Sequence, residues 1–154
     1  MRSSGLLQRA SLVWITLAAF SLFACFPFDG DESEKHLKVS SLLRRTWVLN
    51  THTRNGSTDT LSDSTLRVVF SDSGAVSLFG CNVTRGTFTL ERDTIRFGPM
   101  YRTAMACLSA TRQSGDAWAD SLLAGPLAAR VSGGELFLTL DESVFRLRDS
   151  AKVK

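Results

Sequence analysis

Short runs in which apolar and polar residues alternate, separated by turn-forming residues, limit most strongly the folds open to this chain. In Thr65–Phe70, for example, Leu66, Val68 and Phe70 occupy every second position, which places their side chains on one face of a strand. The turn signal Ser71–Gly74 follows directly. Eight such runs are predicted as strands: Thr46–Thr51, Thr65–Phe70, Ala75–Phe79, Gly86–Leu90, Thr94–Phe97, Leu127–Val131, Glu135–Leu140 and Val144–Arg148.

One segment has helical periodicity instead. Trp118 and Leu122 fall on one side of a helix that Gly125-Pro126 ends, and Ser114 or Asp116 is the predicted N-cap. Seven or eight short strands with one helix predict a mainly β fold. We expect a small antiparallel, barrel-like twisted sheet, because closure removes exposed strand edges, with the helix over an open end or seam.

The N-terminal region has the three parts of an export signal. Arg2 and Arg9 precede an apolar run of about 14 residues, which is too short to span a hydrocarbon core that needs about 20. Residues 22–25 read Leu-Phe-Ala-Cys, an order that resembles the bacterial lipobox. We therefore expect cleavage before Cys25 and acylation of that cysteine. A simple N-terminal anchor and cleavage by an ordinary signal peptidase are the alternatives.

The predicted organisation follows from this leader. The segments are a lipoprotein signal peptide (1–24), a lipidated cysteine with a polar tether (25–40), a β domain (41–150) and a short tail (151–154). The predicted location is the bacterial cell envelope, with the chain lipid-anchored in the membrane, facing the periplasm and sorted to the outer membrane. Nucleic acid is not a predicted partner, because the basic residues do not cluster on one face.

The cysteines divide between the anchor and the domain. With Cys25 taken by lipid, Cys81 and Cys107 are the remaining pair, and an oxidising compartment favours a disulfide between them. Two buried free thiols are the alternative, since the sequence does not show how closely the two Cβ atoms approach.

Two local motifs carry a family resemblance. Gly80-Cys81-Asn82 precedes the strand Gly86–Leu90, and Thr103-Ala104-Met105-Ala106-Cys107 precedes the predicted helix. Their order and spacing over residues 41–150 resemble the META (HslJ-like) domain family. The resemblance implies a small barrel-like β fold with a helix, in proteins associated with envelope stress responses, and it transfers no catalytic residue.

The motif residues have structural interpretations. Gly80 permits a positive φ or a close backbone approach at a strand end, and Asn82 can hydrogen-bond neighbouring backbone groups and hold a turn. Met105 is predicted to fill the barrel from the connection before the helix. A structural role is the favoured interpretation for the whole cluster, and ligand binding is the alternative. Its members are Gly80, Asn82, Thr103, Met105 and Ala106.

No catalytic constellation emerges from the sequence. His36 lies in the acidic tether and His52 in a polar segment, so neither neighbours a plausible nucleophile. The cysteines and histidines lack the close-paired spacing of metal ligands. We therefore predict that the chain is not an enzyme and uses no metal or cofactor.

The predicted function is that of a non-enzymatic envelope lipoprotein with a stress-related or envelope-integrity role, exerted by binding an apolar ligand or an envelope protein partner. Residues available for an apolar ligand, or for ordinary core packing, are Trp47, Phe88, Phe97, Met105 and Trp118. The alternative is an inhibitor or interaction module acting on a secreted or envelope enzyme. Its available surfaces are the segments His52–Ser64 and Met100–Thr111.

Overall fold

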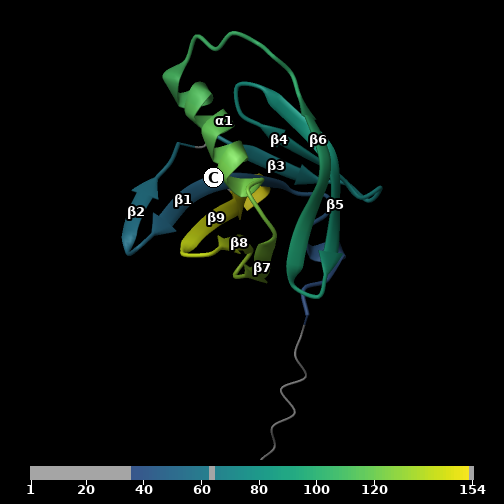
Figure 1. The fold of residues 1–154 in the computed structure, drawn as a ribbon. Helices are drawn as coiled ribbons and strands as arrows, with labels where there is room; N and C mark the ends of the chain where they lie inside the picture. The colour runs from purple at the N-terminus through teal and green to yellow at the C-terminus, as the bar shows by residue number, and fades with distance from the viewer. Residues whose placement is uncertain (1–35, 63–64, 153–154) are drawn as a thin grey trace, which may run out of the picture. The chain divides into compact units, whose positions relative to one another are not determined.

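The computed structural model describes residues 36–62 and 65–152, so the predicted signal peptide, Cys25 and most of the predicted tether lie outside the described residues. Within the described part, nine strands and one α-helix follow a single turn of 3₁₀ helix, η1 (Val39–Ser41) (Figure 1). The strands are β1 (Thr46–Arg54), β2 (Ser57–Thr60), β3 (Arg67–Phe70), β4 (Ala75–Phe79), β5 (Val83–Glu91), β6 (Thr94–Arg102), β7 (Leu127–Ser132), β8 (Glu135–Leu140) and β9 (Ser143–Asp149). The helix is α1 (Ala110–Leu122), and a second 3₁₀ turn, η2 (Ser150–Lys152), follows β9.

The sheet closes on itself. Its strands follow the order β2-β1-β3-β4-β5-β6-β7-β8-β9, and an additional antiparallel pairing of β1 with β9 completes an eight-stranded barrel. Strand β2 pairs only with β1 and lies outside the closed ring among the described residues. The predicted antiparallel barrel with one helix is therefore confirmed.

The polar segment after the first predicted strand differs from the prediction. The first strand is predicted to end at Thr51 with no strand directly after it, but β1 continues to Arg54 and turns at Asn55 and Gly56, both with positive φ, into β2. All four residues of β2 are exposed, so neither face needs apolar side chains. A strand of this kind carries no alternating pattern by which to recognise it.

The strands β5 and β6 are also longer than predicted. The alternating sequence pattern predicts that the strand beginning at Thr94 ends at Phe97, yet β6 continues through Gly98 and Pro99 to Arg102. The register between the two strands shifts between Gly86 and Phe88, which indicates a β-bulge. Glycine and proline are tolerated at such an irregularity. They also interrupt the alternation of apolar and polar residues by which the rest of the strand would have been predicted.

The helix begins earlier than predicted. Its N-cap is Ser109, and its first residue is Ala110, whereas Ser114 and Asp116 both lie inside it. Its buried residues are Gly115, Ala119 and Leu122, which attach it to the barrel. Within the described segments, no helix is both long and apolar enough to cross a bilayer.

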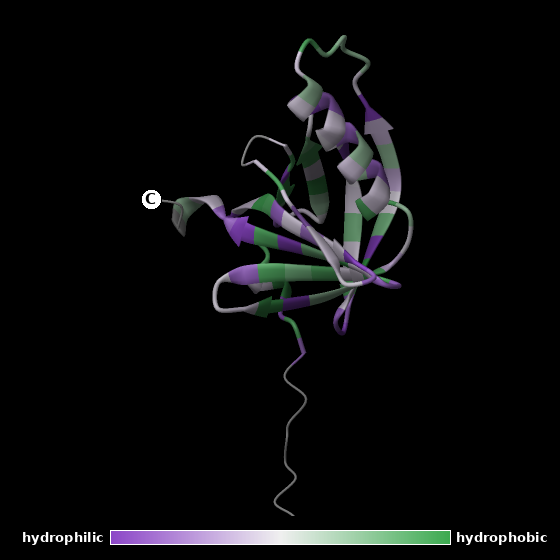
Figure 2. Cartoon of the chain, turned by 90° about the vertical axis from the view of Figure 1, so that its left-hand side faces the viewer, coloured by the Kyte–Doolittle hydropathy of each residue, from purple (hydrophilic) through white to green (hydrophobic). Residues whose placement is uncertain are grey.

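The barrel interior is filled by its own side chains. Trp47, Phe70 and Phe145 are at most 1% exposed, and Leu residues from six strands or their flanking turns surround them. Figure 2 shows the corresponding alternation of hydrophobic and hydrophilic colour along the strands. Trp47 also donates its indole N–H to the Leu42 carbonyl at 3.0 Å.

The five aromatic and apolar candidates have different positions. Trp47 and Phe88 belong to the core, and Phe97 and Trp118 pack against it while partly buried. Met105 does not fill the barrel, because 58% of it is exposed on the segment before α1. That interpretation of Met105 is therefore wrong: the barrel core is already occupied, which leaves the methionine outside.

Candidate functional site

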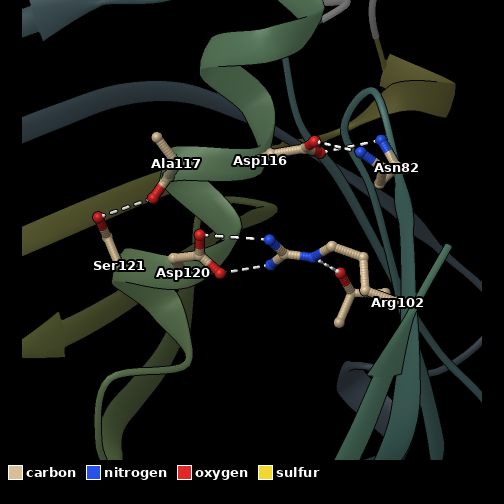
Figure 3. Close-up of polar contacts among 7 residues, drawn as sticks. Asn82, Arg102, Asp116, Ala117, Asp120 and Ser121 are labelled. Carbon is tan, nitrogen blue, oxygen red and sulfur yellow. Dashed lines mark hydrogen bonds and ion pairs between the residues drawn. The ribbon is translucent and has the colours of Figure 1, made fainter. Parts of the chain in front are cut away.

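Asn82 lies where the β4–β5 turn, the segment before α1 and α1 itself meet. Its backbone N–H donates to Asp116 Oδ1 at 2.9 Å, and its Nδ2 donates to Asp116 Oδ2 at 2.7 Å. Figure 3 shows the two side chains facing each other between the turn and the helix. Both carboxylate oxygens of Asp116 are thus used by one residue of the turn.

The amide oxygen of Asn82 holds the segment before the helix. Asn82 Oδ1 accepts hydrogen bonds from the Met105 backbone N–H at 2.7 Å and from Thr103 Oγ1 at 3.2 Å. Thr103 Oγ1 in turn accepts from the Val83 N–H at 3.0 Å. The Asn82 side chain is predicted to bond neighbouring backbone groups of its own turn, but its partners in the structure are remote in sequence: Thr103, Met105 and Asp116.

A disulfide adds a covalent link at the same place. Cys81 is bonded to Cys107, with 5.9 Å between their Cα atoms, which confirms the predicted pairing. Asp116 lies beside the two sulfur atoms, but bonded sulfurs offer no thiolate to a metal. We call residues 103–109, which this bond and Asn82 both hold, the stapled loop.

Two glycines allow the helix to approach the turn. A Cβ added at Gly80 would lie 2.8 Å from the carbonyl carbon of Gly115, and one added at Gly115 would collide with the Thr65 carbonyl oxygen. Of the two predicted reasons for Gly80, this contact confirms close backbone approach, whereas its φ is not positive. Gly115 is the partner that the sequence alone did not indicate.

An ion pair fixes the start of the stapled loop to the helix. The Arg102 guanidinium at the end of β6 contacts both carboxylate oxygens of Asp120, and its Nε donates to Thr84 Oγ1 at 2.7 Å (Figure 3). The hydrogen bond to Asp120 raises the pKa of Arg102. The loop is therefore held at both of its ends.

Three large apolar side chains on and beside this loop face solvent. Tyr101 is 67% exposed, Met105 58% and Leu108 fully exposed. In Figure 2 the hydrophobic colour extends along the segment leading into the helix. We call Tyr101, Met105 and Leu108 the apolar patch; Ala106, between the latter two, is exposed as well.

Basic residues flank the apolar patch. A hollow of about 440 Å³ lies between Arg67 and Arg112, with Phe79, Val83 and Met105 among its lining residues. Outside the hollow, Arg85 pairs in register with Tyr101. None of the described residues forms an ion pair with these three arginines.

The sequence matches a known protein family, and the fold is similar to that of solved structures. Residues 40–152 match the family model of the META domain. The chain belongs to the META domain family. Its META domain is also similar in fold to two proteins solved by NMR. One, from Burkholderia xenovorans, has a TM-score of 0.59 and 21% identity, over 73% of this chain and 86% of that one. The second has a TM-score of 0.58 and 17% identity, over 73% of this chain and 94% of that one. No curated protein matches the sequence.

Some residues of the META domain site were not recognised from the sequence. Asp116 was interpreted as a helix cap, and Asp120 had no predicted role. Arg102 and Leu108 were included only as part of the segment Met100–Thr111, an available surface in the alternative interaction-module prediction. An Asp at positions 116 and 120 marks one face of a helix, because residues four apart are neighbours. That spacing was the available signal, but it does not say what the face contacts.

Proposed function

We propose that this META domain chain is a non-enzymatic lipoprotein of the bacterial cell envelope that binds a protein partner through the apolar patch. The lipid is proposed at Cys25 and the location at the outer membrane, with the domain in the periplasm. The observation that carries the proposal is that Met105 and Leu108 are exposed on a segment that a disulfide and Asn82 hold in place, with Tyr101 exposed beside it at the end of β6.

The anchoring of the stapled loop supports a role of its exposed apolar side chains in binding a partner. An exposed apolar side chain on a mobile segment loses conformational freedom when it docks, which weakens association. Here the Cys81–Cys107 bond and the Asn82 hydrogen bonds have already restricted the loop. Exposed apolar groups in a fixed arrangement are typical of protein-interaction surfaces, and tyrosine is enriched at their energetic centres.

The filled barrel favours a protein partner over an apolar ligand held inside. Trp47 and Phe145 occupy the interior and are at most 1% exposed. The hollows beside the stapled loop and beside the helix are open at the surface instead. A lipid chain would therefore have to displace core side chains, whereas a protein surface can dock on the apolar patch without doing so.

The charge of the site indicates what the partner carries. Arg67 and Arg112 border the hollow at Met105, and Arg85 lies beside Tyr101. Such a surface is complementary to carboxylates placed next to apolar side chains, and this arrangement mainly accelerates and orients association. We propose a partner with such an acidic and apolar surface. An envelope or secreted enzyme that the loop inhibits is one class of such a partner.

The position of the loop fits this role. The Leu37 backbone N–H donates to Asp93 Oδ1 in the β5–β6 turn, so the chain reaches the domain there. Figures 1 and 2 both show the stapled loop at the opposite end of the domain from that turn. The apolar patch therefore lies at the end of the domain remote from the point where the N-terminal segment joins it.

Site-specific photo-crosslinking in the producing bacterium tests the partner. A photo-reactive residue at Leu108 should yield a discrete crosslinked protein, whereas one at Ser132, an exposed residue of β7, should not. Excess purified domain should compete for the crosslink. The double variant Met105→Ser/Leu108→Ser should fail to compete while its unfolding free energy changes by less than about 0.5 kcal/mol, since both side chains are exposed.

Three outcomes would contradict the proposal. They are equal crosslinking at Leu108 and Ser132, undiminished competition by the double variant, and crosslinks from Leu108 to lipid alone. If Leu108 crosslinks to lipid alone, the purified domain should also float with anionic vesicles and the double variant should not. That result would indicate that the apolar patch binds a membrane surface instead of a protein.

Intact mass spectrometry of the membrane-extracted protein tests the anchor separately. We expect a chain that starts at Cys25 and carries added acyl mass. An untrimmed chain recovered from the cytoplasm, with Cys81 and Cys107 both alkylatable, would refute the proposed location.

A further inference from the structure

A second hollow lies beside the C-terminal half of α1, away from the stapled loop. Its volume is about 520 Å³, and its lining residues come from β1, from α1 and the segment after it, and from β8, β9 and the turn between them. His52, Trp118 and Phe145 line it, and the exposed charged residues Arg54, Asp141 and Glu142 border it. A volume of this order is typical of small-molecule sites.

Three rings form the aromatic wall of this hollow. The His52 ring lies 4.7 Å from the Trp118 ring and 4.8 Å from the Phe145 ring, measured between centroids. Trp118 and Phe145 are 6.4 Å apart in an edge-to-face arrangement. Trp118 is only partly buried although it packs against the core, so part of its indole remains open to the hollow. A planar apolar group can stack there.

His52 is a polar group in a largely apolar place. The residue is 8% exposed, and no described residue hydrogen-bonds its buried Nδ1. The nearest charged atom to Nδ1 is Asp59 Oδ2, 3.9 Å away on β2.

The charges around the hollow have a negative excess. Asp141 and Glu142 form no ion pair with any residue that the structure describes, and Arg54 is the single cation among the lining residues. The last turn of α1, with Ser121, borders the same space. Free carbonyls at a helix C-terminus contribute further partial negative charge.

From this arrangement we infer that the hollow is a binding site for a small aromatic amine. The ring of the ligand stacks against the open part of the Trp118 indole, behind which the Phe145 ring lies buried. The ammonium group lies in the field of Asp141 and Glu142. Aromatic faces themselves attract a cation, which adds to the same preference. The inference is independent of the proposed protein partner, because the two sites share no lining residue.

NMR titration of the purified protein with three simple probes tests the inference. Phenethylamine has both the ring and the cation, 3-phenylpropionate has the ring with an anion, and propylamine has the cation without the ring. We expect saturable shifts of the Trp118 indole N–H and of β8–β9 turn amides with phenethylamine. The other two probes should bind at least about fivefold more weakly, which corresponds to about 1 kcal/mol.

Variants separate the ring and charge contributions. Asp141→Asn/Glu142→Gln should abolish the preference for phenethylamine over 3-phenylpropionate, whereas Glu91→Gln, an exposed acid on β5, should retain it. Ala124→Phe should fill the hollow and abolish the shifts without removing a core side chain. No saturable shift with phenethylamine, tighter binding of 3-phenylpropionate, or unchanged binding by Ala124→Phe would each overturn the inference.

Discussion

The side-chain amide of Asn82 both donates and accepts hydrogen bonds, and few other residues can replace it. Its oxygen accepts from Met105 and Thr103 on the stapled loop, and its nitrogen donates to Asp116 on α1. An aspartate would supply the acceptor but not the donor, and an alanine would supply neither. The identity of residue 82 is therefore specified by two neighbours with opposite hydrogen-bonding needs.

Exchanging the two side chains tests this arrangement. Asn82→Asp removes the donor and places two carboxylates against each other, so we expect a loss of about 2 kcal/mol or more in unfolding free energy. The double variant Asn82→Asp/Asp116→Asn restores an amide donor, now at position 116, opposite a carboxylate acceptor at position 82. Chemical denaturation should show that it recovers most of the loss.

A matched variant controls for the added charge. Asn55→Asp introduces the same change in the exposed β1–β2 turn and should shift stability by less than about 0.5 kcal/mol. If the losses of the two single changes at 82 and 116 simply add in the double variant, the two side chains do not interact as described.

Asp93 gives a second prediction at the scale of a residue. The Leu37 backbone N–H and the His36 ring both hydrogen-bond its carboxylate, and these contacts lower its pKa below the usual value of 3.8. A lowered folded-state pKa stabilises the fold above the unfolded value and stops doing so as the pH falls through the folded one. Asp93→Asn should therefore lose stability relative to wild type at neutral pH but converge with it in acid.

Carboxyl NMR titration and denaturation at several pH values measure this effect. A midpoint for Asp93 above 3.8, or a stability difference that grows on acidification, would contradict the assigned hydrogen bonds.

At the scale of elements, α1 and the end of β4 lie unusually close together because each has a glycine at the contact, Gly115 on α1 and Gly80 after β4. A glycine inside a helix ordinarily costs about 1 kcal/mol relative to alanine. Gly115→Ala should nevertheless destabilise the protein, by about 2 kcal/mol or more, because the new methyl would collide with the Thr65 carbonyl oxygen.

Ser114→Ala is the matched control for that substitution. Ser114 is exposed one position earlier in the same helix, so the change should be close to neutral. Thermal unfolding compares the two variants. A stabilising effect of Gly115→Ala would show that the helix does not lie against Thr65.

The elements that could be predicted from sequence are those with one buried face. Strands β4 and β8 alternate in burial along their length, and both were predicted at their observed bounds. Strand β2 is exposed on both faces, and β6 crosses Gly98-Pro99 at the end of a bulged pair, so neither retained an alternating pattern. The helix start was misplaced because Ser109 caps it without a side-chain hydrogen bond.

At the scale of the whole molecule, the disulfide spans the β5–β6 pair. Cys81 and Cys107 are 26 positions apart, and both β5 and β6 lie between them. Closing a segment of this length contributes about 3.5 kcal/mol in the chain-entropy description. Part of the global stability therefore depends on an oxidising environment.

Cysteine substitutions should act as a unit. Cys81→Ser alone should destabilise about as much as Cys81→Ser combined with Cys107→Ser, because either change removes the same bond. Denaturation of the two variants under oxidising conditions measures this relation. Additive losses would argue against a shared bond.

The candidate site could be predicted only in part. The motifs identified Cys81, Cys107, Gly80 and Asn82 as a cluster, since their residue types have local structural reasons. The exposure of Met105 could not be predicted, because a methionine reads equally well as core filling or as an interaction residue. The pairing of Arg102 with Asp120 depends on the path of the chain between β6 and α1.

The path by which the chain joins the barrel has a mechanical consequence. Leu37 is hydrogen-bonded to Asp93, and β1 is then paired with β3 along one edge and β9 along the other. If the N-terminus is tethered as proposed, tension on it would pull β1 along its own axis. The backbone hydrogen bonds on both edges of β1 would then bear the force together, as a shear force, rather than break one after another. A domain pulled between its anchor and a docked partner would therefore resist extension with its most extensively paired strand.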